Sequence, residues 1–214
     1  MMPLSTQGEP SPPAPFVPLR GNNLALDLVN TEHLHRRKSR DLLQDVAQLQ
    51  AWWNVVCVER PEGELARELA GSVQWNEPLW EQVREFRWAL RDLFTAVATG
   101  TPLPSPALIQ LNNVLANGYP VLQWRPEQGV ISTYQTRDEA QGGILLPIAL
   151  AAARLLQEGE HTRVRACPNC IGLFYDTSKS GTRKWCSERC MGRARSREYY
   201  QATKRAHLAE ARGT

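Results

Sequence analysis

The sequence predicts an α+β fold in two parts: a mainly helical N-terminal domain that contains a β-hairpin, and a small cysteine-bearing module at the C-terminus. Three observations support this prediction. Apolar residues recur at helical spacing through much of residues 42–115, and residues 119–136 alternate as a hairpin does. Four of the five cysteines fall between residues 167 and 190.

The chain has 214 residues, enough for one sizeable domain and a small appended one. Residues 1–18 are rich in proline and lack the basic and apolar regions of a signal peptide, so we expect a flexible tail there. The helical domain is expected to span residues 19–160 and the cysteine module residues 161–214.

Hydropathy and charge predict the compartment of the protein and a difference between its two parts. The longest apolar run, "GGILLPIALAAARLL", contains Pro147 and Arg154 and is too short for a membrane span, so we expect a soluble, cytoplasmic protein with reduced thiols and no membrane contact. The net charge is +3, yet residues 161–214 hold 12 Lys and Arg against 4 Asp and Glu. A basic C-terminal part and an acidic remainder predict separate tasks.

The first elements are expected between residues 21 and 73. The segment "GNNLALDLVNTEHLH" fits either a strand or a helix. Asp41 has the side chain of an N-cap, and we expect a helix after it, followed by a second short helix through Leu65 and Leu69. Residues 32–40 are expected to form a surface loop, because His33 and His35 are two apart and would point to different sides of a helix.

The pattern is clearer further along. Residues 77–99 form the most regular apolar stripe, and Gly100 is expected to end that helix. Ser105 is expected to cap the next helix, and "RPEQG" to be the turn of a hairpin. Pro147 suits the first turn of a helix that runs to about residue 157.

Cys167, Cys170, Cys186 and Cys190 form a C-x2-C pair and a C-x3-C pair, with fifteen residues between them. This spacing predicts a zinc site, and reduced thiols disfavour the alternatives of two disulfides or a redox dithiol. Four thiolates complete the tetrahedral coordination of zinc, so we expect one structural Zn²⁺ with no open position for catalysis.

The residues between the two pairs predict the shape of the module. "LFYD" and "RKWC" are expected to pair as short strands, and Ser187 to cap a helix with Cys190 in its first turn. A knuckle, a hairpin and a helix make a treble-clef-like zinc finger. Phe174 and Trp185 would form a core too small to be stable without metal. Cys57 is expected to be an inert core residue.

Two segments carry a family resemblance. "CPNCIGLFYDTSKSGTRKWCSERCMGRARSR" resembles the CGNR zinc finger, although the signature reads CMGR here and Gly192 stands at the position of its Asn. "LRGNNLALDLVNT" and "VREFRWALRDLF" are similar to parts of the ABATE domain, which accompanies that finger in bacterial proteins. The resemblance covers most of residues 19–205 and implies a transcription regulator.

A basic helix is expected after the finger. Arg189, Arg193, Arg197, Tyr200 and Lys204 fall within an arc of about 80° on a helical projection. Arg183 and Lys184 could extend this surface. Such spaced cations suit the phosphates of a nucleic-acid backbone, most simply DNA, whereas a solvated or protein-binding face is the alternative.

A second candidate site lies in the larger domain. If residues 24–31 are helical, Asp27, Asn30 and Thr31 share one face and could bind a small polar effector together with Arg87 or Arg91. The alternative is structural: Asp27 would cap or pair within the core, and Asn30 would end the element. No catalytic triad, phosphate-binding loop or HExxH motif is present, so an enzyme is not predicted.

The sequence therefore favours a zinc-finger transcription regulator that binds DNA, with an N-terminal domain that senses a small molecule or mediates homodimerisation. Two alternatives stay open. The finger could be a zinc-stabilised module that binds protein or RNA, or it could be a structural cap on a small-molecule-binding protein or enzyme.

Overall fold

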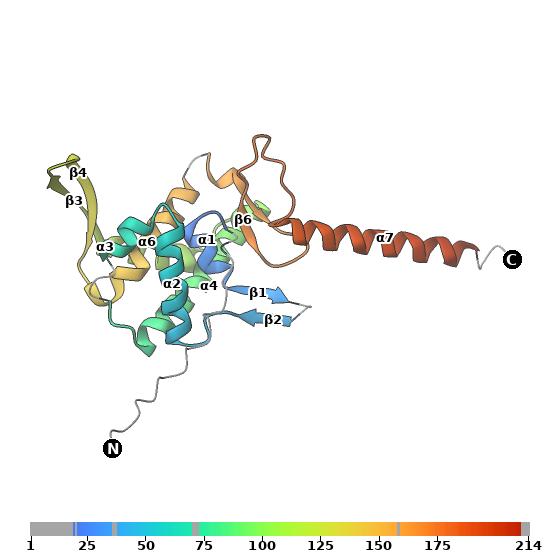
Figure 1. Ribbon diagram of the computed structural model, residues 1–214, viewed down its shortest axis with the longest axis horizontal. Coiled ribbons are helices and arrows are strands. Elements are labelled where there is room, and N and C mark those ends of the chain that lie inside the picture. Colours follow the sequence, from blue (N-terminus) through green and yellow to red (C-terminus); the bar gives the residue numbers. More distant parts are fainter. Residues whose placement is uncertain (1–18, 20, 36–37, 70–72, 158, 211–214) are drawn as a thin grey trace, which may run out of the picture.

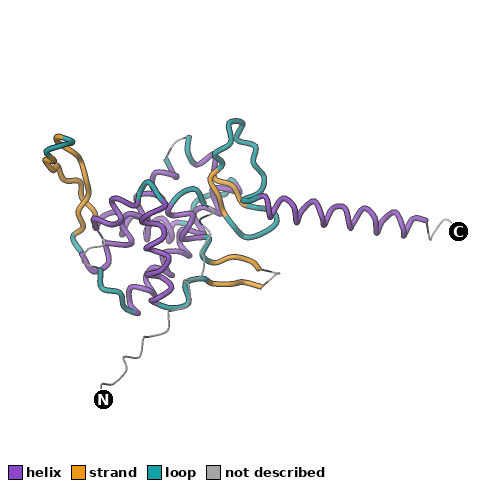
Figure 2. The backbone as a smooth tube through the Cα atoms, viewed as in Figure 1, coloured by secondary structure: helices purple, strands orange, loops and turns teal. Residues whose placement is uncertain are grey.

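The computed structural model describes residues 19–210, except residues 20, 36–37, 70–72 and 158. Most helices gather into one body, the β3–β4 hairpin projects from one end of it, and α7 projects from the other (Figures 1 and 2). The elements are α1 (Leu24–Val29), β1 (Glu32–His35), β2 (Lys38–Asp41), α2 (Val46–Glu59), α3 (Gly63–Leu69), α4 (Glu77–Thr99), α5 (Ser105–Asn117), β3 (Gly118–Arg125), β4 (Gly129–Thr136), α6 (Glu139–Leu156), the 3-10 helix η2 (His161–Arg163), β5 (Val164–Ala166), β6 (Leu173–Tyr175) and α7 (Glu188–Glu210).

The short helix α1 lies inside the body, and all six of its residues are buried. It packs against α4 and α6, whose apolar stripes form the main core with α2 and part of α5. Asn23 caps α1 by accepting hydrogen bonds from the Ala25 and Leu26 amides. Because α1 is buried on every side, no face of it needs polar residues. The leucines of this segment therefore show no single periodicity.

Several expected elements are confirmed. The helix of residues 77–99 ends at Gly100, which adopts the left-handed conformation with φ of 68°. The hairpin is present as β3 and β4, and Trp124 pairs with Val130 beside the turn. The predicted architecture is also confirmed: a mainly helical N-terminal region with small two-stranded sheets, followed by a four-cysteine cluster with a hairpin.

The start of the second helix was predicted wrongly. Asp45, rather than Asp41, is the N-cap of α2, and its carboxylate accepts from the Gln48 amide. Asp41 instead closes β2 and bonds Arg87. The surface loop expected at residues 32–40 is also wrong, because β1 and β2 pair there as an antiparallel hairpin.

Two proline-related boundaries differ from the prediction as well. Ser105 is the first residue of α5 and not its cap, since Pro104 holds the cap position without a side-chain hydrogen bond. Pro147 lies inside α6, which begins at Glu139. A proline within a helix costs about 3 kcal/mol. Here the flanking residues Leu146 and Ile148 are fully buried in the core, and their packing offsets that cost.

The predicted strand pairing in the cysteine module was wrong for one of its two strands. β6 pairs with β5, which precedes the first cysteine pair, and not with "RKWC". The later segment stays a loop because the buried Asp176 carboxylate accepts hydrogen bonds from the Ser178 and Arg183 amides. These bonds close the loop on itself and use the amide that a strand partner would need.

The main core crosses the division predicted at residue 160. Val164 of β5 and Leu173 of β6 are buried in the same cluster as the helices of the larger part. A second, smaller cluster holds Phe174 and Trp185 with the four cysteines. The domain boundaries themselves stay a prediction, but the finger is joined to the body by apolar packing on this side.

Candidate metal centre and nucleic-acid interface

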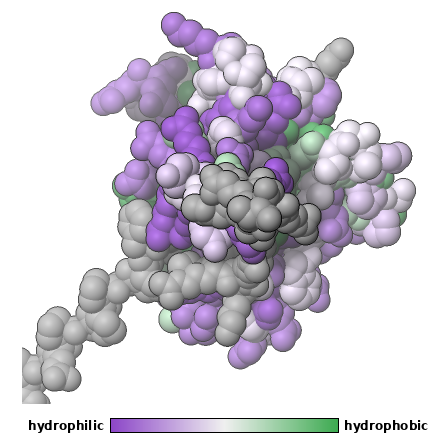
Figure 3. Space-filling view, turned by 90° about the vertical axis from the view of Figure 1, so that its right-hand side faces the viewer, coloured by the Kyte–Doolittle hydropathy of each residue, from purple (hydrophilic) through white to green (hydrophobic). Residues whose placement is uncertain are grey.

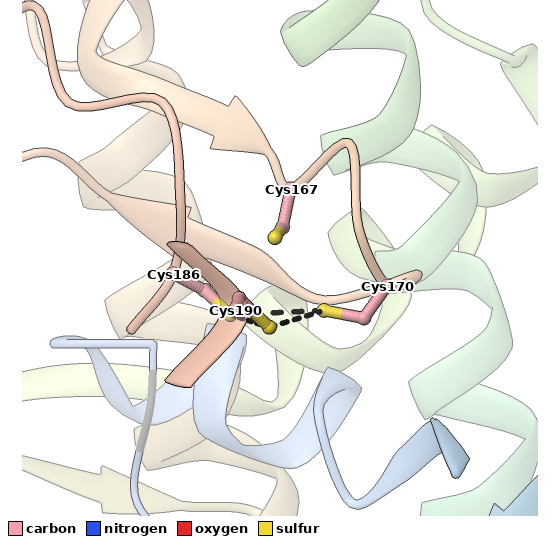
Figure 4. Close-up of side chains that lie close together, drawn as sticks. All are labelled: Cys167, Cys170, Cys186 and Cys190. Atoms are coloured by element: carbon pink, nitrogen blue, oxygen red, sulfur yellow. Dashed lines mark hydrogen bonds between the residues drawn. The ribbon is translucent and has the colours of Figure 1, made fainter. Parts of the chain in front are cut away.

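The four sulfur atoms of Cys167, Cys170, Cys186 and Cys190 all lie within 4.8 Å of one another. Figure 4 shows the four side chains converging from the knuckle, the loop and the start of α7. The Sγ atoms of Cys170, Cys186 and Cys190 are 3.6, 3.6 and 3.8 Å apart. All five cysteines of the chain lie in its described part, and none forms a disulfide.

These distances fit a zinc tetrahedron. With Zn–S bonds of about 2.3 Å, the edges between sulfurs are about 3.8 Å. A disulfide needs sulfurs only about 2.05 Å apart. The donor set, four sulfurs in a buried cluster, is also the one that structural zinc prefers. The residues present therefore fit the metal.

Local hydrogen bonds that involve backbone amides hold three of the four cysteines in place. The Cys170 amide donates to the Cys167 carbonyl at 3.3 Å, which closes the knuckle. The Cys167 amide donates to the Gly172 carbonyl, and the Gly172 amide donates to Cys170 Sγ at 3.4 Å. On the helix side, Ser187 Oγ accepts from the Cys190 amide, so Ser187 caps the first turn of α7.

Three of the thiols, those of Cys167, Cys170 and Cys186, shift one another's pKa. Hydrogen bonds from Cys170 and Cys186 lower the pKa of Cys167, whereas the hydrogen bond with Cys167 raises the pKa of Cys170 to about 12. The hydrogen bond with Cys167 likewise raises the pKa of Cys186. The cluster thus resists a second negative charge unless a cation balances it. A divalent ion supplies that balance, with thiolates as its ligands. Burial, by contrast, raises the pKa of the isolated Cys57, in keeping with an inert core thiol.

Arg183, predicted to contact nucleic acid, is built into the finger. Its guanidinium lies over the Phe174 ring and donates to the carbonyls of Trp185 and Cys186. Lys184, next to it, is exposed. The two neighbours therefore face different surroundings: Arg183 is half-buried against the finger, and Lys184 is exposed.

The predicted cations of α7 lie in solvent. Arg189, Arg193, Arg197 and Lys204 are exposed, and none of their side chains forms a hydrogen bond or ion pair with another residue in the described part of the chain. Tyr200 on the same arc is 69% exposed. Figure 3 views the molecule from the side where α7 projects, and the coloured residues on this face are mostly hydrophilic.

Each of the proposed effector residues is bonded to other groups of the protein. Asp27 accepts from the Gly21 amide and pairs with Arg60, whose Nε lies 2.5 Å from the carboxylate. Asn30 is the C-cap of α1 and bonds the backbone of Leu173. A cleft of about 320 Å³ lies elsewhere, between α3 and the β3–β4 hairpin.

Arg87 is fully buried and forms two hydrogen bonds to Asp41 and one to Thr31. Burial alone raises the pKa of Asp41, but the bonds from Arg87 and the Leu43 amide outweigh it and leave that pKa below its usual value. Sequence reasoning missed two ion pairs, Arg60 with Asp27 and Arg87 with Asp41. Both join residues more than thirty positions apart, and no spacing rule signals such contacts.

Within the residues that the structure describes, no helix has the length and apolar character needed to cross a lipid bilayer.

Comparison with known families gives two matches. Residues 22–159 match the ABATE family, described as "Putative stress-induced transcription regulator", and residues 163–202 match the CGNR zinc finger. No curated protein matches the chain. The first match alone covers well over half of the sequence. The chain therefore belongs to the ABATE family of transcription regulators, and its four-cysteine cluster is the zinc site of a CGNR zinc finger.

Proposed function

We propose that this protein regulates transcription by binding DNA through the exposed cationic face of α7, defined here as Arg189, Arg193, Arg197, Tyr200 and Lys204. The single observation that carries the proposal is the placement of these cations. They line one side of a projecting helix whose first turn supplies a ligand of the zinc cluster, Cys190. The metal would thus fix the angle at which the helix leaves the body.

The dimensions of α7 suit a duplex. Its 23 residues span about 34 Å at 1.5 Å per residue. The major groove of B-DNA is about 12 Å wide and admits an α-helix, while cations along the helix neutralise phosphates at the groove edges. Tyr200 would offer a hydroxyl to a phosphate or a ring to a base.

The zinc chemistry supports regulation over catalysis. Four cysteine ligands leave the metal no position for water or substrate, so zinc would stabilise the finger without taking part in a reaction. We propose that the N-terminal part supplies sensing or pairing, and that a change there reaches α7 through the core that both parts share.

The test compares two charge reversals of equal size on the same helix. Arg193→Glu with Arg197→Glu alters the cationic face, and Arg195→Glu with Arg205→Glu alters exposed positions away from it. Affinity for a mixed-sequence duplex is measured by fluorescence anisotropy at low salt, with zinc content checked for every sample.

We expect the first pair to lower DNA affinity by about tenfold or more and the second to have a much smaller effect. Equal losses for both pairs would show that only the total charge matters. Retention of full affinity by the first pair would refute the assignment, as would a clear preference for duplex RNA.

A further inference from the structure

We propose that Asn30, at the end of α1, is a positioning residue for the zinc site, so that metal retention by the finger depends on a side chain of the ABATE region. The inference concerns the metal centre and does not rest on DNA binding.

Asn30 holds the backbone of the finger with both ends of its amide. Its Nδ2 donates to the Leu173 carbonyl at 2.6 Å, and its Oδ1 accepts from the Leu173 amide at 2.9 Å. The side chain therefore pairs with β6 as a neighbouring strand would. The residue is 7% exposed, and its own amide is bonded to the Leu26 carbonyl at the end of α1. Its position is thus fixed by a helix of the main core.

The bonded residue is next to the metal knuckle. Leu173 follows Gly172, which accepts from the Cys167 amide at 2.9 Å and donates to Cys170 Sγ at 3.4 Å. Gly172 thus touches both cysteines of the first pair through its backbone. Asn30, Gly172, Cys170 and Cys186 also line one small cavity. A shift of the Leu173 backbone would therefore move the groups that set the position of two sulfurs.

The absence of a side chain at Gly172 brings the knuckle close to Asn30. A Cβ atom at this position would lie 3.2 Å from Cys170 Sγ and 3.4 Å from Asn30 Oδ1. Only a glycine therefore lets the backbone approach both the sulfur and the amide this closely. Motion of the knuckle away from Asn30 would break the two hydrogen bonds to Leu173.

Arg91 of α4 holds the adjacent residue in the same way. Its Nη1 donates to the Ile171 carbonyl at 3.2 Å, and its Nη2 donates to the carbonyls of Val29 and Glu32. One guanidinium therefore joins the knuckle to the end of α1 and the start of β1. Residues that orient metal ligands in this way typically change metal affinity about 10- to 100-fold when removed.

The experiment uses the full chain and two asparagines at opposite ends of the same helix. Asn30→Ala removes the bonds to Leu173. Asn23→Ala removes another buried asparagine side chain, which caps α1 and donates to the Ala151 carbonyl, and which forms no hydrogen bond to the described residues of the finger. Zinc affinity is measured by competition with a chromogenic chelator, global stability by thermal unfolding, and ligand geometry by the visible spectrum of the Co²⁺-substituted protein.

We expect Asn30→Ala to weaken zinc binding about 10- to 100-fold and to change the Co²⁺ spectrum. Asn23→Ala should lower the melting temperature yet leave zinc affinity and the spectrum unchanged. Asn30→Asp keeps the acceptor for the Leu173 amide and loses the donor. This variant replaces Asn30→Ala if the alanine protein does not fold, and it too should bind zinc more weakly than Asn23→Ala.

Two results would overturn the inference. One is wild-type zinc affinity together with an unchanged Co²⁺ spectrum in the Asn30 variant. The other is an equal loss of zinc affinity in the Asn23 variant, which would mean that zinc retention follows the stability of α1 in general.

Discussion

The guanidinium carbon of Arg183 lies 5.0 Å from the centre of the Phe174 ring, in the small core beside the zinc ligands. The same side chain donates to the carbonyls of Trp185 and Cys186, the residues that lead into the second cysteine pair. Arg183 thus joins the two halves of the finger.

Arg183→Ala should therefore act on the finger first. Loss of the stacking and of the charge-assisted hydrogen bonds should destabilise the zinc-bound finger by about 2 kcal/mol. Lys184→Ala is the control, because Lys184 is exposed and was predicted to extend the cationic face. This change should lower DNA affinity with no change in zinc release. Zinc release to a chelator and DNA anisotropy separate the two effects. A variant of Arg183 that loses only DNA affinity would assign this residue to the DNA surface instead.

Asp41→Asn should destabilise the body of the protein. The change leaves the fully buried Arg87 without its carboxylate, at a cost of about 2–3 kcal/mol in the free energy of unfolding at pH 7. Since the pKa of Asp41 is lowered in the folded state, its contribution is complete above the usual pKa of an aspartate and is lost as the pH falls through the lowered value. Urea unfolding at pH 7 and at about pH 3 measures both effects. The difference between wild type and variant should shrink at the lower pH, and a constant difference would contradict this interpretation.

Removal of zinc should loosen the finger before the body. The cluster around Phe174 and Trp185 is small, whereas Val164 and Leu173 are packed into the main core. After chelation, we expect amide hydrogen exchange to accelerate in residues 167–190 and at the start of α7, while α4 stays protected. Loss of protection in α4 to the same extent would show that finger and body unfold as one unit.

Gly192→Ala should stabilise α7. Gly192 lies on the exposed part of this helix, and a Cβ atom there would have no neighbour within 4 Å. Replacing glycine by alanine inside a helix gains about 0.5–1 kcal/mol. Helix content from circular dichroism should rise or hold to a higher temperature, with zinc content unchanged. Lower helicity would mean that the position needs the freedom of glycine.

The metal site was predictable because all four ligands lie in one short segment, where spacing alone limits the geometry. The helix after Ser187 was predictable for the same reason, since a cap and its helix are neighbours in sequence. The regular stripe of α4 and the alternation of β3 and β4 are likewise local signals.

Contacts between distant residues were not predictable. Asp41 and Asp45 are both good caps, and only the position of Arg87, 46 residues later, assigns Asp41 to another task. Asn30 meets Leu173 across 143 residues, and β6 takes β5 as partner because the loop after it is closed by Asp176. In each case tertiary packing decides among options that are locally equal.

The central claim, that the cationic face of α7 binds the DNA backbone, is tested most directly by the salt dependence of affinity. The zinc-loaded protein is titrated into a fluorescent duplex at several salt concentrations. If Arg189, Arg193, Arg197 and Lys204 each meet one phosphate, log K should fall against log salt with a slope of about −3.6. A slope near zero, or no binding at low salt, would contradict the account.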